Sequence, residues 1–399
     1  MGIPIGFNDS NGSDIGMSLV EKSYLIDRYP ELADTYRFAG LWMWGDNFYG
    51  VLGDNTIVSK SSPVQTIAGG TNWKQVARGY YSGGIKTDGT LWMWGQNQYG
   101  GLGTNNTSNY SSPVQVSGGG TNWKQLSIAG YHAAAIKTDG TLWSWGWNNY
   151  GQLGINIVSA AGNGNSVPVQ ILGGGTNWKQ VSAGPGLGHT AAIKTDGTLW
   201  LWGLNSYGAL GLNDTTNRSS PTQVTGGGTN WKTVNAGYAR TAAIKTDGTL
   251  WLWGLNSFGQ LGINSTANTS TPVQVTGGGT NWKQVALGYH HTIAIKTDGT
   301  LWTWGGNNYG QLATNDIVDR STPGQTVAGG TNWKMVSIQS AIKTDGTLWT
   351  WGQNGAGQLG DNTIVNKSSP VQTIAGGTNW IFLGLAASMA IRDDSMDLL

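Results

Sequence analysis

One sequence feature constrains the fold of this chain more than any other: two tryptophan motifs alternate along most of its length. Leu-Trp-x-Trp-Gly and Thr-Asn-Trp each occur seven times, with successive copies about 51 residues apart. Together they hold 21 of the 22 tryptophans. A fixed period of this length predicts a repeat architecture, in which each unit is one supersecondary element that buries its apolar face against its neighbours.

One unit, residues 229–275, shows the expected element order. It contains four short β-prone runs, NWKTV, TAAIK, TLWLW and TPVQV, which we label strands A to D. Asp247-Gly248 between B and C predicts a hairpin with a type I′ turn. The run GGGTN links D to the next A, where glycine permits a tight connection. Seven such units predict an all-β protein, a seven-bladed β-propeller of four-stranded blades.

The two ends of the repeat array predict how the ring closes. The first Leu-Trp-x-Trp-Gly copy, at Leu41, has no Lys-Thr-Asp-Gly before it, and the last Thr-Asn-Trp copy is followed by MAIRDD in place of AAIKTD. Strands C and D from the N-terminal end should therefore join A and B from the C-terminal end in one composite blade. The predicted organisation is an N-terminal docking arm (1–40), the propeller (41–394) and a C-terminal tail (395–399).

The order GxxHTAAIKTDGTLWxWGxNxYGQLG, followed by SxPxQV, resembles the regulator of chromosome condensation repeat family. The resemblance covers about residues 41–394 and implies a seven-bladed propeller. For the founder of that family it also implies nucleosome binding and nucleotide exchange on a small GTPase. The acidic arm, with three basic and six acidic residues, and the near-identical repeats argue against this transfer. A guanine nucleotide exchange factor-like regulator is therefore a distant alternative.

Charge and composition exclude several classes of function. The formal net charge is +1, only 11% of residues are charged, and no basic run could follow a phosphate backbone, so we expect no nucleic-acid partner. No apolar run is long enough to predict a membrane span. The chain has no cysteine and therefore no disulfide or thiol chemistry.

The repeated polar residues favour a structural role over a catalytic one. Lys-Thr-Asp-Gly occurs in six units, which indicates a turn with local ion pairing. His132, His189 and His291 each precede the isoleucine of strand B by four residues, so we expect hydrogen-bonding residues at the start of that strand. No Ser-His-Asp set and no carboxylate pair has meaningful spacing. The chain is predicted not to be an enzyme and to need no cofactor and no metal.

Functional positions are expected where the repeat is broken. In an antiparallel blade the A–B and C–D loops emerge on one face, here called the loop face, and the B–C turns and D–A links on the other, the turn face. The departures from the repeat cluster on the loop face, where aromatic residues could stack on sugars or form protein hot spots. The candidate residues for a partner or glycan are Arg78, Tyr80, Tyr81, Trp147, Leu187 and His290.

The arm is the second departure. Residues 18–36 mix apolar and charged residues, and Ser18 with Glu21 predicts a capping box that opens a short helix, which Pro30 interrupts. The candidate arm interface is Leu19, Val20, Tyr24, Leu25 and Tyr29. The arm and the near-identical repeats together also resemble repeat-bearing bacteriophage proteins.

The predicted function is a non-enzymatic structural or interaction protein that presents its loop face to a protein or receptor. The arm would contact a protein partner and anchor the chain as a virion component, either in a tail or as a capsid accessory protein. The expected location is virion or extracellular-facing, and otherwise cytoplasmic. The alternative is a lectin-like propeller that binds a cell-surface glycan.

Overall fold

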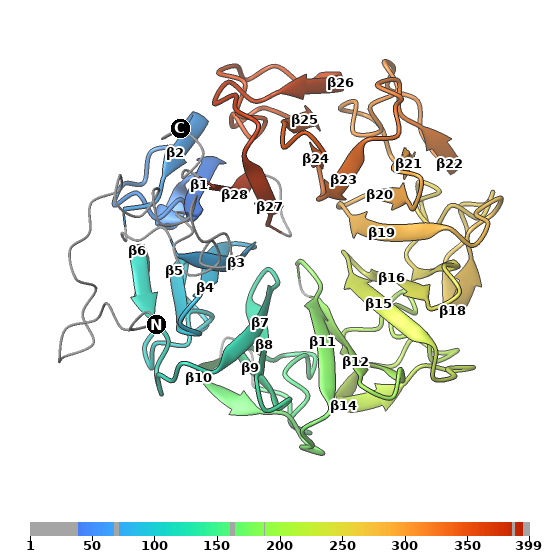
Figure 1. Ribbon diagram of the computed structural model, residues 1–399. Helices are drawn as coiled ribbons and strands as arrows, with labels where there is room; N and C mark the ends of the chain where they lie inside the picture. Colours follow the sequence, from blue (N-terminus) through green and yellow to red (C-terminus); the bar gives the residue numbers. More distant parts are fainter. Residues whose placement is uncertain (1–38, 68–71, 160–163, 187, 385–387, 394–399) are drawn as a thin grey trace, which may run out of the picture.

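The computed structural model describes residues 39–67, 72–159, 164–186, 188–384 and 388–393. Its strands form seven four-stranded antiparallel sheets, which are arranged as blades around a central axis (Figure 1). The predicted all-β seven-bladed propeller is therefore confirmed. Strands A to D of the sequence become the inner, second, third and outer strands of each blade.

The inner and second strands form the hairpin nearest the axis. We number the continuous blades 1 to 6 in chain order and call the remaining one the composite blade. From blade 1 to the composite blade, the inner strands are β3 (Trp73–Arg78), β7 (Trp123–Ile128), β11 (Trp178–Ala183), β15 (Trp231–Ala236), β19 (Trp282–Leu287), β23 (Trp333–Val336) and β27 (Trp380–Leu383). The second strands are β4 (Tyr81–Lys86), β8 (His132–Lys137), β12 (His189–Lys194), β16 (Arg240–Lys245), β20 (His291–Lys296), β24 (Ser340–Lys343) and β28 (Met389–Asp393).

The third and outer strands complete each blade toward the rim. In the same blade order, the third strands are β5 (Leu91–Gly95), β9 (Leu142–Trp147), β13 (Leu199–Gly203), β17 (Leu250–Gly254), β21 (Leu301–Gly305), β25 (Leu348–Gly352) and β1 (Ala39–Gly45). The outer strands are β6 (Tyr110–Gln115), β10 (Gly164–Gln170), β14 (Arg218–Gln223), β18 (Thr269–Gln274), β22 (Arg320–Gln325), β26 (Lys367–Gln372) and β2 (Lys60–Gln65).

The ring closes through the composite blade, as the sequence predicts. Its strand order is β2-β1-β28-β27, so the first described strand pairs with the last. The β1–β28 register runs from Ala39 opposite Asp393 to Met43 opposite Met389. Both chain ends therefore contribute two strands to one sheet, and the seam between β1 and β28 holds the ring shut.

Neighbouring blades pack through a tryptophan face against a leucine face. Leu250 and Leu252 of blade 4 are buried in one cluster with Trp282 and Trp304 of blade 5. Trp253 has no exposed surface, and its Nε1 donates a hydrogen bond to the carbonyl oxygen of Ala209 in blade 3 at 2.8 Å. Burying one aromatic side chain removes roughly 150–250 Å² from water, so these wedges contribute a large share of the core.

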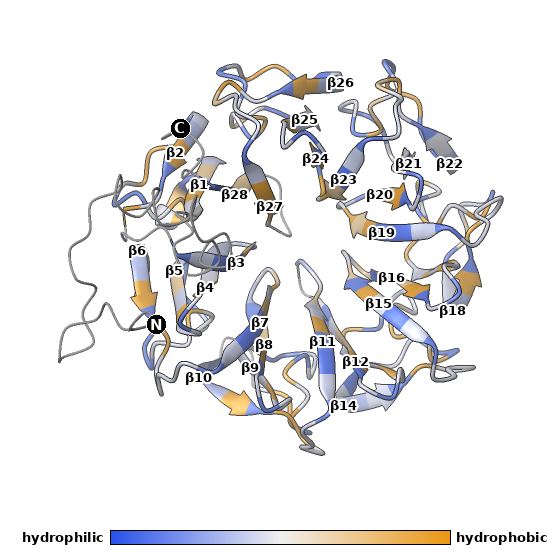
Figure 2. Ribbon diagram, in the orientation of Figure 1, coloured by the Kyte–Doolittle hydropathy of each residue, from blue (hydrophilic) through white to orange (hydrophobic). Residues whose placement is uncertain are grey.

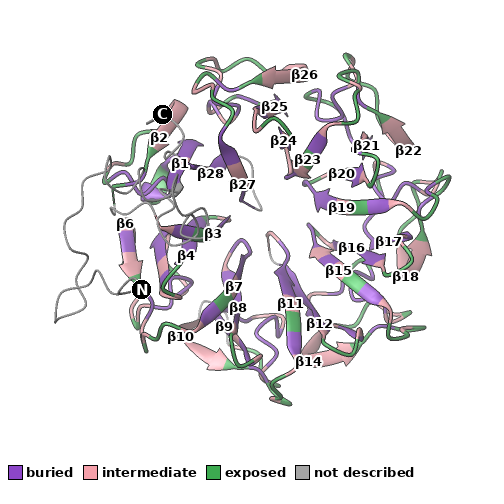
Figure 3. Ribbon diagram, in the orientation of Figure 1, coloured by how far each residue is buried: buried purple, intermediate pink, exposed green. Residues whose placement is uncertain are grey.

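The inner strands combine buried and exposed positions along a single strand. In β7, β11, β15 and β19 the first residue is a buried tryptophan and the second an exposed lysine (Figure 3). Figure 2 shows the same mixture as hydrophobic and hydrophilic stretches on β19. Within the described part of the chain no helix is long and apolar enough to cross a membrane, and η2 (Phe48–Gly50) is a single 3-10 turn.

Candidate functional site

The Lys-Thr-Asp-Gly segment closes the hairpin between the second and third strands on the turn face. In blade 4 the Gly248 amide donates to the Lys245 carbonyl and the Lys245 amide to the Thr249 carbonyl, both at 3.0 Å. Gly248 has φ = 80°, whereas Asp247 is not among the residues with positive φ. The turn is thus a three-residue loop with one left-handed residue, and the predicted type I′ turn is wrong. The Asp247 carboxylate accepts hydrogen bonds from the Thr249 amide and hydroxyl, at 2.9 and 2.7 Å, which satisfies the turn locally.

The lysine of this motif lies between two indole rings. Lys245 Nζ is 4.8 Å from the ring centroid of Trp231 and 4.3 Å from that of Trp251. The other continuous blades repeat the arrangement, and Arg392 takes the place of lysine in the composite blade. A cation held over two aromatic faces stabilises its hairpin, so the repeated motif builds the blade.

The recurrent histidines join neighbouring blades. His132 Nε2 and His189 Nε2 each hydrogen-bond a threonine hydroxyl of the following blade, at 2.9 and 2.7 Å. His291 Nε2 lies 2.8 Å from the carbonyl oxygen of Ile338 in blade 6. This matches the expected hydrogen-bonding role at the start of the second strand.

Burial keeps these three histidines neutral. Desolvation, aided by the nearby His189, lowers the pKa of His132 to about 3. Desolvation lowers the pKa of His189 and of His291 to about 4. A general acid or base works best when its pKa lies near the ambient pH. The pKa values of these imidazoles lie well below 7, so they do not fulfil this condition near pH 7. Across the described ranges no three histidine, cysteine, aspartate or glutamate side chains cluster as a metal site requires.

Blade 4 places an arginine where its neighbours place histidine. The buried Arg240 guanidinium donates to the carbonyl oxygens of Gly288 and His291, both at 2.7 Å, and of Tyr289 at 2.8 Å. Desolvation lowers its pKa to about 9. Arg240 therefore positions the A–B loop of blade 5, which carries Tyr289.

Two of the sequence-predicted loop-face residues lie in the protein interior. Trp147 is the last residue of β9, is only 8% exposed and contacts the ring of Tyr131 with centroids 5.9 Å apart. Tyr81 is the first residue of β4, and burial raises its pKa well above the ordinary value. An exposed role for either side chain is therefore wrong, because each lies on a strand that packs between blades. Leu187 and the predicted arm interface lie outside the described residues.

Arg78 connects blade 1 with the composite blade. Its guanidinium donates to the carbonyl oxygens of Trp44 at 3.0 Å and Asp46 at 2.6 Å. Desolvation lowers its pKa to about 10, and the negative charge of Asp46 opposes the shift. These two hydrogen bonds hold the Arg78 side chain in place between the blades.

Four tyrosines of the A–B loops form a set, of which the sequence pointed to Tyr80 alone. Tyr80 and Tyr289 are 41% and 49% exposed, and Tyr238 lies 5.8 Å from Tyr289 between ring centroids. Tyr131 lies 4.8 Å from Tyr80. Each follows a glycine in its A–B loop, and this Gly-Tyr dipeptide, present in four blades, was the available signal. We call Tyr80, Tyr131, Tyr238 and Tyr289 the tyrosine set.

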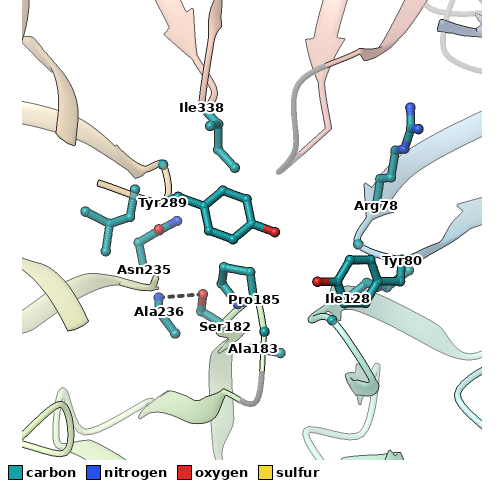
Figure 4. A pocket seen from close by; sticks show the side chains of 15 residues that line it. Arg78, Tyr80, Ile128, Ser182, Ala183, Pro185, Asn235, Ala236, Tyr289 and Ile338 are labelled. Atoms are coloured by element: carbon teal, nitrogen blue, oxygen red, sulfur yellow. Dashed lines mark hydrogen bonds between the residues drawn. The ribbon is translucent and has the colours of Figure 1, made fainter. Parts of the chain in front are cut away.

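Two members of the tyrosine set, Tyr80 and Tyr289, line a cavity of about 140 Å³ on the propeller axis. Figure 4 shows Tyr80 and Tyr289 extending into it from opposite sides, with Ile338 and Pro185 on either side of the Tyr289 ring. Desolvation, followed by the neighbouring Tyr80 phenol, raises the pKa of Tyr289 to about 12. The Tyr289 phenol therefore stays neutral near pH 7 and presents an aromatic face with a hydrogen-bonding hydroxyl.

His290 is half-buried beside this set. Its ring centroid lies 4.7 Å from that of Phe258 and 6.5 Å from that of Tyr238. Desolvation, together with the charge of Arg240, lowers its pKa. The structure thus brings Arg78, Tyr80 and His290 near one part of the loop face.

A family model supports the sequence resemblance. The regulator of chromosome condensation (RCC1) repeat matches residues 88–136, 139–193, 196–244, 247–295, 298–341 and 345–381. The chain belongs to the RCC1 repeat family. A second RCC1 repeat model matches four segments between residues 123 and 311.

Curated relatives match about half of this RCC1-repeat chain. The ultraviolet-B receptor UVR8 of Arabidopsis thaliana is 35% identical over 201 residues, which cover 48% of this chain and 43% of that protein. The probable E3 ubiquitin-protein ligase HERC4 of Rattus norvegicus is 32% identical over 213 residues, which cover 51% of this chain and 19% of the ligase. Less than half the length of these relatives is therefore matched.

Solved structures share the fold at low sequence identity. Human WBSCR16 superposes with a TM-score of 0.77 at 20% identity, covering 89% of this chain and 98% of that one. Yeast RCC1 (Prp20), in its complex with Kap60, gives a TM-score of 0.77 at 17% identity and covers 91% of both chains. At this identity the likeness concerns the fold alone.

Proposed function

We propose that this chain is a non-enzymatic interaction protein whose loop face binds a protein partner through the tyrosine set. The observation that carries the proposal is the meeting of Tyr80 and Tyr289 from blades 1 and 5 in one axial cavity. Tyrosine is enriched at protein interfaces, where it supplies apolar area and one hydrogen-bonding group. The surrounding backbone is held by Arg78 and Arg240, so the tyrosines are presented on fixed loops.

Relatives with the same fold support a protein partner. Yeast RCC1 was solved in complex with Kap60, and Prp20p of Saccharomyces cerevisiae is known for binding Gsp1p and histones. These partners belong to those proteins. What we propose for this chain is the general use of the propeller as a protein-binding scaffold, with the partner set by its own loops.

Catalysis is not part of the proposal. HERC4 proteins are named as ligases, but the matched segment covers 19% of their length. The buried histidines of the described blades are neutral hydrogen-bonding residues between blades. We therefore assign this propeller the binding role only.

The protein-binding role of the N-terminal arm and the location of the protein stay predictions. The relatives named above give no support to a virion role, and the arm interface lies outside the described residues. The glycan alternative likewise stays a prediction, since aromatic loops suit sugars as well as proteins.

Paired variants test the proposal. In one, Tyr80→Ser and Tyr289→Ser remove two phenols of the tyrosine set. In the control, Lys124→Ser and Lys232→Ser change two exposed inner-strand residues. Both variants and the wild type are prepared as the full-length chain and used to capture proteins from its source cells. Each captured protein is then purified, and its affinity for the wild type and for both variants is measured by titration. We expect a direct partner that binds the wild type and the lysine control and loses at least about tenfold affinity for the tyrosine variant. Equal affinity for all three would contradict the proposal.

A further inference from the structure

Blade 6 has a shorter inner hairpin than its neighbours. β23 and β24 are four residues long, whereas β19 and β20 of blade 5 are six. The turns are alike: the Ser337 amide donates to the Ser340 carbonyl at 2.8 Å, and the Gly288 amide to the His291 carbonyl at 2.9 Å. The four missing residues are therefore lost as two from each strand, with the turn retained.

This shortening interrupts the loop face at one place. β24 begins at Ser340, which pairs with Thr350, so blade 6 has no residue at the position where His291 pairs with Gly305 in blade 5. Its A–B turn carries Ile338 and Gln339 in place of a tyrosine. In its C–D loop Ala356 stands where blade 5 has the exposed Tyr309.

A cavity of about 540 Å³ lies at the place where blade 6 is shortened. Its walls include four glutamines, and Tyr289 and Tyr309 of blade 5 line it as well. Arg78, Tyr289 and Ile338 line both this cavity and the axial one. The two cavities together form a groove, which we call the blade-6 groove, that runs from the axis outward over the short turn. The glutamines are Gln311, Gln339, Gln353 and Gln358.

The polar end of the groove is rich in amide groups. Gln311 Oε1 accepts a hydrogen bond from the Tyr309 amide, and Gln358 Oε1 from the Ala356 amide, both at 2.7 Å. Their carboxamide nitrogens remain as donors, and Gln339 adds a carboxamide with both a donor and an acceptor. The charges that line this part, Arg78 and Asp46, are opposite and adjacent.

The axial end of the groove is mainly apolar, although Arg78, Ser182 and Asn235 also line it. Ile338, Ile128 and Leu287 line it together with Pro185 and the ring of Tyr289. An occupant must therefore combine an apolar group at the axis with uncharged donors and acceptors farther out. A peptide main chain alternates N–H and C=O groups along its length, and a carboxamide side chain pairs with both.

We infer that the blade-6 groove binds an extended, uncharged peptide segment of the protein partner. One aliphatic side chain of that segment lies in the axial cavity, and its main chain hydrogen-bonds the glutamine carboxamides. The inference rests on the proposed function and deepens it, because it names the part of the loop face and the form of the partner that meet.

A loop graft tests this inference. Residues 337–343, SIQSAIK, are replaced by the blade-5 sequence ALGYHHTIAIK of residues 286–296, which restores the missing strand residues and fills the groove. The matched control is the Lys124→Ser, Lys232→Ser variant, whose two exposed lysines line neither cavity. The probe is a displayed library of random short peptides.

The wild type and the lysine control are expected to enrich uncharged peptides that share one aliphatic residue. Their affinity for the blade-6 graft should fall by at least about tenfold. Should the graft not fold, the double variant Gln339→Ala, Gln353→Ala gives the same comparison without altering the backbone. No enriched peptide from the wild type, equal binding by the graft, or selection of a glycan in place of peptides on an array would overturn the inference.

Failure of this inference can be distinguished from failure of the proposed function. If the graft still binds the full-length partner while the Tyr80→Ser, Tyr289→Ser variant does not, the loop face is the interface and the groove is not. If neither change affects partner binding, both statements fail.

Discussion

Leu41 and Ile391 lie directly opposite each other in adjacent antiparallel strands, although 349 residues separate them in the chain. Both side chains are buried in one cluster with Trp73 and Trp94 of blade 1. The pairing joins the two ends of the propeller and lets every blade complete four strands. Ring closure therefore depends on a strand of only five residues, β28.

Removing residues 388–399 should open the ring. The deletion takes away β28, which lies between β1 and β27, and leaves backbone groups of both without partners. We expect the single cooperative thermal transition to be lost, measured by tryptophan fluorescence and circular dichroism. A control deletion of residues 394–399 keeps β28 and should keep the transition. Unchanged melting of the longer deletion would show that the composite blade does not hold the ring.

Trp147→Ala should be strongly destabilising. The side chain is buried among Tyr99, Tyr131 and Tyr150, so its removal leaves a cavity that should cost about 3–5 kcal/mol of unfolding free energy. Tyr80→Ala, at a half-exposed ring, should cost about 1 kcal/mol or less. Urea denaturation of both variants measures the difference. Similar values for the two would contradict the burial of Trp147.

The buried histidines should make the protein less stable in mild acid. The pKa values of His132, His189 and His291 in the folded state, about 3 to 4, lie below the ordinary value of 6.5, so the unfolded chain binds protons that the folded chain does not. The free energy of unfolding should be constant with respect to these groups above pH 6.5 and fall as pH drops toward 4. Each histidine contributes a slope of up to about 1.4 kcal/mol per pH unit.

His132→Asn isolates one of these contributions. The carboxamide can still hydrogen-bond Thr190 but does not titrate, so the pH slope between 6.5 and 4.5 should decrease by about a third. Urea denaturation at half-unit pH steps gives the slope for variant and wild type. An unchanged slope would mean that His132 is protonated in the folded protein.

Lys245→Met should affect stability and leave binding intact. Methionine keeps the aliphatic stem but removes the ammonium group from the faces of Trp231 and Trp251, which should cost about 0.5–1 kcal/mol. Denaturation measures the cost, and titration with the partner found by the tyrosine test checks binding. If Lys245→Met lost affinity for the partner at unchanged stability, the turn face would be the binding surface.

The fold and the ring closure could be predicted because both depend on particular residue types at fixed positions of the repeat. Glycine after aspartate marks the hairpin of each continuous blade, and two tryptophans mark each third strand. The ends of the array lack complementary halves of a blade, so Leu41 and Ile391 could be expected to meet. The turn type was missed because Asp-Gly occurs in both two-residue and three-residue hairpins, and only backbone angles distinguish them.

The functional surface was less accessible from sequence. Trp147 departs from the repeat, yet it extends β9 into the protein interior, since strand length is set by pairing with the neighbouring strands. Tyr131, Tyr238 and Tyr289 were overlooked because they recur, although their loops converge on the axis. The four-residue loss in blade 6 was visible in the sequence. The structural effect of this loss depended on whether the four residues are missing from the turn or from the strands, and a single sequence does not show which.

If the loop face binds a protein and the turn face builds the blades, a cross-linking group should capture a partner on the loop face alone. Tyr289 on the loop face is replaced with p-benzoylphenylalanine and, in a matched variant, Lys232 on inner strand β15 is replaced in the same way. After irradiation in source-cell extract, mass spectrometry identifies the cross-linked proteins. We expect a specific protein adduct at position 289 and none at position 232. An adduct at position 232 alone would contradict it.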